Sequence, residues 1–92
     1  MVVFIFSKEA KKTLQKLPIE VQERVQQKLF FFKNHPDIFS EAKPIHGRRP
    51  VTHRIRVGNY RLTLELSTAY PQYVHLIVFR IADIGHRKDI YS

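Results

Sequence analysis

Cysteine is absent from this chain of 92 residues, which excludes a disulfide framework, a thiolate metal site and a cysteine nucleophile. Long apolar runs are absent too. The apolar run over residues 2–6 is too short to span a membrane or to form the core of a signal peptide. We therefore expect a soluble, intracellular protein of the cytoplasm with no membrane partner.

Motifs for metals and cofactors are also missing. The histidines show neither HxH nor HExxH spacing and no paired acids accompany them, so no metal site is expected. A Gly-rich phosphate loop and a Ser-His-Asp arrangement are absent, and we expect no small-molecule cofactor. The chain has no repeat and no linker, and its length suits a single domain over residues 1–92 with a modest core.

Acidic residues are few: eight Asp and Glu stand against sixteen Lys and Arg, which gives a net charge of +8. A positive field of this size attracts nucleic acid, acidic lipid or an acidic protein. Binding to a membrane surface would concentrate the cations on one amphipathic helix, whereas here they are spread over the whole chain. The composition therefore favours nucleic acid as the partner.

The apolar pattern predicts the first three structural elements. Residues 2–6 are typical of a covered strand, and Ser7 can cap a helix that ends at Pro18. Pro18 can open a second helix, because its missing N–H is harmless there. The apolar stripe of this second helix comprises Val21, Val25, Leu29 and Phe32. Of its three consecutive phenylalanines, we expect Phe31 at the helix margin and Phe30 partly covered.

The second half of the chain predicts a loop and then strands. Residues 35–50 contain three prolines and should form a loop with one short helical turn around residues 38–42. A hairpin follows, and residues 73–81 have the character of another strand. This order predicts an α+β fold: an N-terminal strand, a two-helix hairpin and a three-stranded antiparallel meander, in one twisted, mainly antiparallel sheet.

The hairpin around Gly58-Asn59 is the most informative feature. This dipeptide between alternating runs is typical of a two-residue turn, and its register places Arg56 opposite Arg61. Like charges so placed destabilise a sheet by roughly a few tenths of a kcal/mol. Arg54 lies on the same face as Arg56 and Arg61. One explanation of these charges is an ordinary solvated sheet face, on which Glu65 pairs with one of the arginines. A bound polyanion would turn the repulsion into attraction, so we favour a functional basic face.

Four segments carry a family resemblance. They are the helical part 17–25, the segment KPIHGRRP over 43–50, the hairpin RIRVGNYR over 54–61 and the ending GHRKDIY over 85–91. Together, and in this order, they closely resemble the RelE/ParE toxin superfamily. The ending resembles the RelE branch, toxins that cut mRNA in the ribosomal A site, whereas ParE-type gyrase poisons generally lack this basic tail with its tyrosine.

The resemblance implies a RelE-like fold and the role of toxin in a type II toxin–antitoxin system. The implied activity is that of a ribosome-dependent, metal-independent endoribonuclease that cleaves mRNA in the ribosomal A site and inhibits translation. The implied partners are mRNA on the ribosome and a cognate acidic antitoxin, which the phenylalanines of the second helix could help to bind. Two alternatives stay open: a ParE-like inhibitor of DNA gyrase, and an attenuated relative that only binds its antitoxin.

Residue by residue, the resemblance implies catalytic roles at three positions. Arg61 matches an arginine that stabilises the phosphate, and Arg87 matches a tail arginine that stabilises the transition state or assists the leaving group. Tyr91 matches a tyrosine that stacks on or orients the cleaved nucleotide. Further residues are expected to bind RNA: Arg48, Arg49, Arg54, Arg56 and Lys88.

Metal-independent RNA cleavage uses the 2′-hydroxyl as nucleophile on the adjacent phosphate. It needs a catalytic base, which accepts the proton of that hydroxyl. Arg54 and Arg56 occupy strand positions where some relatives carry lysines, and an arginine effectively cannot lose its proton. His86 is the best candidate for the catalytic base, because histidines titrate near neutral pH, and Glu65 is a weaker one. Substrate alignment by the ribosome could also let a weak base suffice, so the base stays open.

Overall fold

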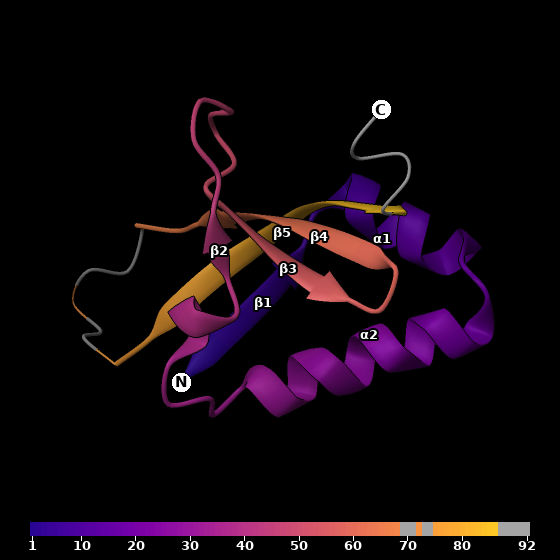
Figure 1. The fold of residues 1–92 in the computed structure, drawn as a ribbon, viewed down its shortest axis with the longest axis horizontal. Coiled ribbons are helices and arrows are strands. Elements are labelled where there is room, and N and C mark those ends of the chain that lie inside the picture. The colour runs from indigo at the N-terminus through magenta and orange to yellow at the C-terminus, as the bar shows by residue number, and fades with distance from the viewer. Residues whose placement is uncertain (69–71, 73–74, 87–92) are drawn as a thin grey trace.

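The fold is described by a computed structural model for residues 1–68, 72 and 75–86 (Figure 1). The elements in chain order are strand β1 (Val2–Phe6), helices α1 (Lys8–Lys16) and α2 (Ile19–Phe32), the short 3-10 helix η1 (Ile38–Ser40), and strands β2 (Lys43–Pro44), β3 (His53–Val57), β4 (Tyr60–Leu66) and β5 (Ile77–His86). The predicted helical turn around residues 38–42 is thus present, and β2 is a short strand within the predicted loop.

The strands form one sheet in the order β1-β5-β4-β3-β2. Strand β1 runs parallel to β5, and the other neighbours are antiparallel. Helix α1 packs against β5 and β1, while α2 packs against β3 (Figure 1). The predicted α+β fold with a mainly antiparallel sheet is therefore confirmed.

The core lies between the helices and the apolar face of the sheet. The predicted stripe of α2 is confirmed, because Val25, Leu29 and Phe32 are buried and Val21 packs beside them. The largest fully buried side chains are Phe32, Phe79, Ile38, Ile55, Leu62, Leu64, Ile81 and Val25. Burial of these groups leaves the opposite face of β3 and β4 for polar side chains.

The run of three phenylalanines divides between core and surface. Phe32 is fully buried, whereas Phe31 is 66% exposed and Phe30 is 77% exposed. The prediction that Phe30 is partly covered is therefore wrong. A helix turns by about 100° per residue, so only one of three consecutive side chains can point at the sheet. Phe30 instead lines an apolar groove between α2 and β1.

The hairpin has the predicted register. Arg56 lies opposite Arg61 and Val57 opposite Tyr60. Gly58 has a φ of +59°, and no residue other than glycine has a positive φ in the described part of the chain. A positive φ at the first central position alone is the pattern of a type II′ turn, which matches the twist of the strands.

Strand β5 begins and ends later than predicted. The expected strand over 73–81 is replaced by Ile77–His86, so Gly85 and His86 belong to the sheet rather than to a tail. Beyond the predicted end the strand contains a β-bulge: Thr63 pairs with Asp83 and Leu64 with Ile81, which leaves Ala82 as an extra residue. The extra residue interrupts the alternation of apolar side chains from which the strand was predicted.

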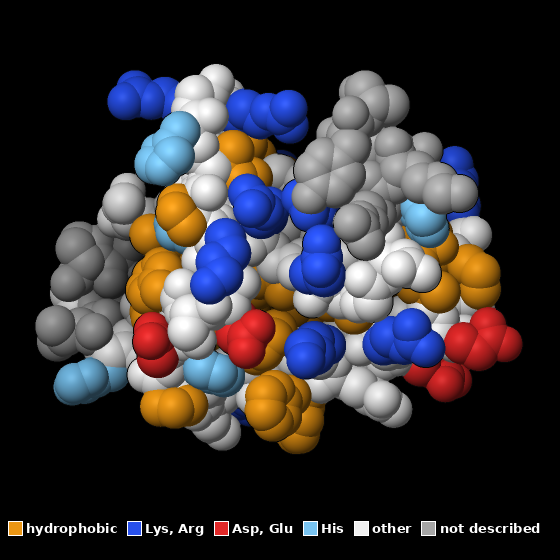
Figure 2. Space-filling model, viewed as in Figure 1, with side chains coloured by type: hydrophobic (Ala, Val, Ile, Leu, Met, Phe, Trp, Pro, Cys, Tyr) orange, Lys and Arg blue, Asp and Glu red, His pale blue; other side chains and the backbone are white. Residues whose placement is uncertain are grey.

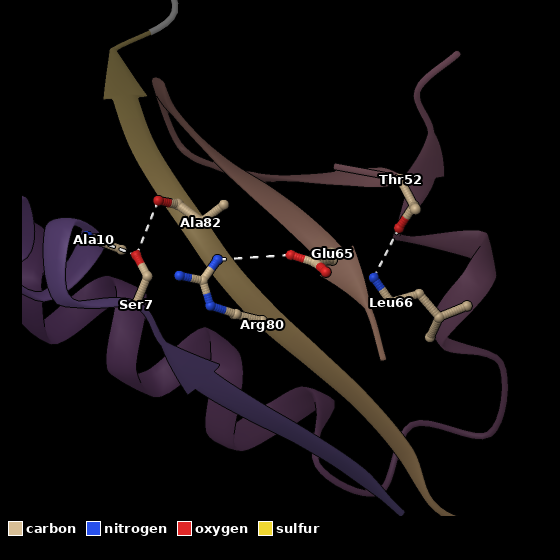
Figure 3. Close-up of polar contacts among 7 residues, drawn as sticks. All are labelled: Ser7, Ala10, Thr52, Glu65, Leu66, Arg80 and Ala82. Atoms are coloured by element: carbon tan, nitrogen blue, oxygen red, sulfur yellow. Dashed lines mark hydrogen bonds and ion pairs between the residues drawn. The ribbon is translucent and has the colours of Figure 1, made fainter. Parts of the chain in front are cut away.

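Ser7 ties the bulge to helix α1 (Figure 3). Its hydroxyl oxygen accepts a hydrogen bond from the Ala10 N–H at 3.0 Å, as predicted for an N-cap, and donates one to the Ala82 carbonyl at 3.0 Å. The Ser7 N–H donates to the Ile81 carbonyl at 2.9 Å. One buried serine therefore joins the end of β1, the start of α1 and the irregular part of β5.

His53 is a half-buried histidine on the apolar face of β3. Its ring lies 5.5 Å, between centroids, from both Phe39 and Phe79. Its Nδ1 lies 2.8 Å from the Thr52 hydroxyl, which accepts a hydrogen bond from the Leu66 N–H (Figure 3). Burial lowers the pKa of His53 below the ordinary 6.5.

Replacing Ser7 should destabilise the fold. In Ser7→Ala the cap of α1 and the bond to the bulge are both lost, and we expect the free energy of unfolding to fall by about 1–2 kcal/mol. Urea unfolding followed by circular dichroism measures this change. Ser40→Ala is the control, because the exposed Ser40 hydroxyl bonds only the nearby Asp37 carbonyl. Equal stability of both variants would contradict the role of Ser7.

His53 should make stability depend on pH. The lowered pKa means that the unfolded chain takes up a proton at a higher pH than the folded chain does. Stability is therefore full above pH 6.5 and declines as the pH falls from there through the lowered pKa. Urea midpoints between pH 7.5 and 5 should decline more steeply for wild type than for His53→Asn. His46→Asn, in an exposed loop, should behave like wild type. If the urea midpoints of all three proteins declined in parallel, His53 would not be the origin of the pH dependence.

Candidate functional site

Two rows of side chains cross the face of the sheet opposite to the core. In the first row Arg56 lies opposite Arg61, which lies opposite Gly85 on β5. In the second row the residues, from β2 to β5, are Lys43, Arg54, Thr63 and Asp83. The rows follow directly from the hairpin register, because alternate residues of a strand share a face.

A cavity of about 250 Å³ opens over these rows. Among the described residues it is lined by Glu41, Lys43, Arg54, Arg56 and Arg61. Figure 2 shows Lys and Arg side chains gathered across the middle of this view, in the region of β2, β3 and β4. We call this cavity the arginine cavity.

The three arginines of the cavity differ in exposure. Arg61 is only 8% exposed, Arg54 is half-buried and Arg56 is exposed. A guanidinium group cannot shed its charge, and it presents several N–H donors that match the oxygens of a phosphate. The cavity therefore combines a deep cation with two shallower ones, which suits a phosphodiester that enters from solvent.

Arg48 and Arg49 lie outside the arginine cavity. Both are exposed in the loop between β2 and β3, which projects from the sheet (Figure 1). Of the residues predicted to bind RNA, the structure therefore brings Arg54 and Arg56 together with Arg61. The two loop arginines lie beyond the strands, between the end of β2 and the start of β3.

His86 does not line the arginine cavity. It pairs with Tyr60 across β4 and β5, and its ring packs edge-on against the tyrosine ring with centroids 5.2 Å apart. Tyr60 packs against the core, so these two rings lie on the face opposite to Arg61. The structure thus places the preferred candidate for the base apart from the arginines.

Glu65, the weaker candidate, is engaged elsewhere. Its carboxylate lies 3.7 Å from the Arg80 guanidinium of β5, toward the end of β4 distant from the hairpin turn (Figure 3).

Sequence reasoning overlooked Glu41, which does line the cavity. Glu41 lies in an irregular loop, where no periodicity shows which way a side chain points.

The predicted tail residues Arg87, Lys88 and Tyr91 lie outside the described residues, and their roles stay predictions.

In the part of the chain that is described, no three His, Asp or Glu side chains gather in a way that could hold a metal ion. None of the helices there has the length and apolar character needed to cross a bilayer.

Fold and site together define a small, strongly basic α+β domain with an arginine-lined cavity on its open sheet face. Solved structures share this architecture. A chain of the RelB–RelE antitoxin–toxin complex from Methanococcus jannaschii is 29% identical, with 95% of this chain and 94% of that chain covered and a TM-score of 0.63. No family model and no curated protein matches the sequence.

Two further structures support the fold. The toxin–antitoxin complex RelBE2 from Mycobacterium tuberculosis has a TM-score of 0.72 at 22% identity, with 92% of this chain and 96% of that chain covered. The isolated RelE toxin of E. coli has a TM-score of 0.60 at 22% identity, covering 97% and 89%. The chain belongs to the RelE-like toxin superfamily.

Proposed function

We propose that this chain is the toxin of a type II toxin–antitoxin pair and that it cleaves mRNA in the ribosomal A site without using a metal ion. The observation that carries the proposal is the arginine cavity, in which Arg54, Arg56 and Arg61 face one space. Guanidinium groups gathered in one cavity repel one another. A polyanionic substrate gives them a purpose.

The proposed reaction uses the 2′-hydroxyl of the RNA as nucleophile on the adjacent phosphate. It needs a group that accepts the hydroxyl proton, cations that stabilise the crowded phosphorane, and a proton for the departing 5′-oxygen. Arg61 is proposed to bind the phosphorane, since it is the least exposed of the three cavity arginines. Arg54 and Arg56 hold the phosphate from the β3 side.

The remaining predicted residues keep their proposed roles. Arg48, Arg49 and Lys88 bind the RNA backbone, Arg87 stabilises the transition state, and Tyr91 orients the cleaved nucleotide. His86 packs against Tyr60, so a role as proton acceptor would require its ring to leave that contact.

The proposed protein partner is an acidic antitoxin. Four of the similar structures are complexes of a RelE-type toxin with its antitoxin, and an acidic segment would complement the positive charge of this chain. The groove between β1 and α2, of about 610 Å³, is a candidate surface for its apolar side chains. Exposed Phe30 lines this groove, which supports the use of the phenylalanines in partner binding. The pair would act in the cytoplasm, where mRNA is translated.

Removing an arginine of the cavity should abolish toxicity. Arg56→Ala and Arg61→Ala should each slow mRNA cleavage in a translating extract by about 10²–10³-fold, because each removes a cation aimed at developing negative charge. Growth after induction and primer extension on a reporter mRNA measure the effect. Because Arg61 is buried, Arg61→Lys serves as a second variant that keeps the charge at this position.

Arg80→Ala is the matched control. It removes one positive charge from the exposed part of β5, outside the arginine cavity, and should leave cleavage within a factor of about three of wild type. If Arg56→Ala and Arg61→Ala were folded and fully toxic, the cavity would not be the active site.

Mapping the nucleic acid that is damaged should separate the candidate activities. Induced wild type should produce mRNA ends that depend on translation and keep one phase relative to the reading frame. Intact mRNA with DNA breaks would identify a ParE-like gyrase inhibitor instead. Normal growth without the antitoxin, and no damage of either kind, would identify an attenuated relative.

A further inference from the structure

We propose that Glu41 is the general base that takes the proton from the 2′-hydroxyl; this inference rests on the proposed function. Glu41 is the one acidic side chain among the described residues that line the arginine cavity. The other lining residues are Lys43, Arg54, Arg56 and Arg61. An arginine does not give up its proton in a protein, so the cavity needs its proton acceptor from another residue type.

The backbone of η1 holds Glu41 at the edge of the cavity. The Glu41 N–H donates to the Ile38 carbonyl at 2.9 Å, and the next residue, Ala42, is buried and donates to the same carbonyl at 2.8 Å. Lys43 then pairs with Arg54 at the start of β2. In an antiparallel pair, moving back along one strand corresponds to moving forward along its partner. Two residues before Lys43 is Glu41, and two residues after Arg54 is Arg56. Glu41 therefore lies beside the row of Arg56 and Arg61.

The Glu41 carboxylate is not committed to another partner within the described part of the chain. The ion pair recorded between described residues joins Arg80 to Glu65 at 3.7 Å. Asp83, on the same face, accepts a hydrogen bond from the Ile84 N–H at 2.9 Å and does not line the cavity. Glu41 is therefore the carboxylate placed to meet a substrate that the arginines hold.

The Glu41 carboxylate takes the proton of the 2′-hydroxyl as the 2′-oxygen forms its bond to phosphorus. The bond from phosphorus to the 5′-oxygen then breaks, and the 5′-oxygen receives a proton from solvent. The products are a 2′,3′-cyclic phosphate and a 5′-hydroxyl end, and the arginines remain protonated throughout.

The test compares Glu41→Gln with Glu23→Gln in single-turnover cleavage of mRNA on programmed ribosomes. Both variants lose one negative charge, but Glu23 lies exposed on α2 and does not line the cavity. Glu41→Gln should slow the chemical step by about 10²–10⁴-fold. Its affinity for the ribosome–mRNA complex should be equal or tighter, because an anion has left a basic cavity. Glu23→Gln should cleave as wild type does, and Glu41→Asp should recover part of the rate.

The pH profile separates a base from a merely electrostatic group. Wild-type cleavage should slow on acidification as one group becomes protonated, and Glu41→Gln should lack that acidic limb. A Glu41→Gln variant that cleaves at the wild-type rate, or that is slow but keeps the limb, would overturn the inference while leaving the nuclease proposal intact. A wild-type protein that cuts no mRNA would overturn both.

Discussion

The opposition of Arg56 and Arg61 across the hairpin is the constraint on which the site depends. Two guanidinium groups in a directly opposed pair repel each other, and the hairpin holds them there because its other face is buried. A slip of β3 by one residue would carry Ile55 and Val57 out of the core. The hydrophobic effect therefore sets the position of charges that would otherwise separate.

Sequence reasoning succeeded where a strong periodicity coincided with a turn signal. The Gly58-Asn59 turn between alternating runs fixed the hairpin register, and the spacing from Val25 to Phe32 fixed the buried side of α2. It failed for β5, because the bulge at Ala82 breaks the alternation without any glycine or proline to mark it. The orientation of Phe30 was also wrong, since a groove beside β1 is a tertiary feature that no local pattern reports.

The candidate site, too, could be predicted from the sequence only in part. Arg54, Arg56 and Arg61 could be placed on one face from strand alternation alone, and the structure brings them into one cavity. His86 was chosen for its chemistry, but its pairing with Tyr60 puts the ring on the other side of the sheet. Glu41 could not be found from the sequence, because its direction is set by η1 and by the two-residue strand β2.

The bulge in β5 also decides what faces the deepest arginine. Were the pairing to continue regularly through Ala82, Asp83 would fall opposite Leu62 in the core, and Ile84 would fall opposite Arg61 on the open face. The extra residue shifts the alternation of β5 by one position. As a result Ile84 is buried, and Gly85, which has no side chain, lies opposite Arg61. Ser7 donates a hydrogen bond to the carbonyl of Ala82, the extra residue, so a contact on the helical side of the sheet anchors the irregularity that decides which residue lies opposite Arg61.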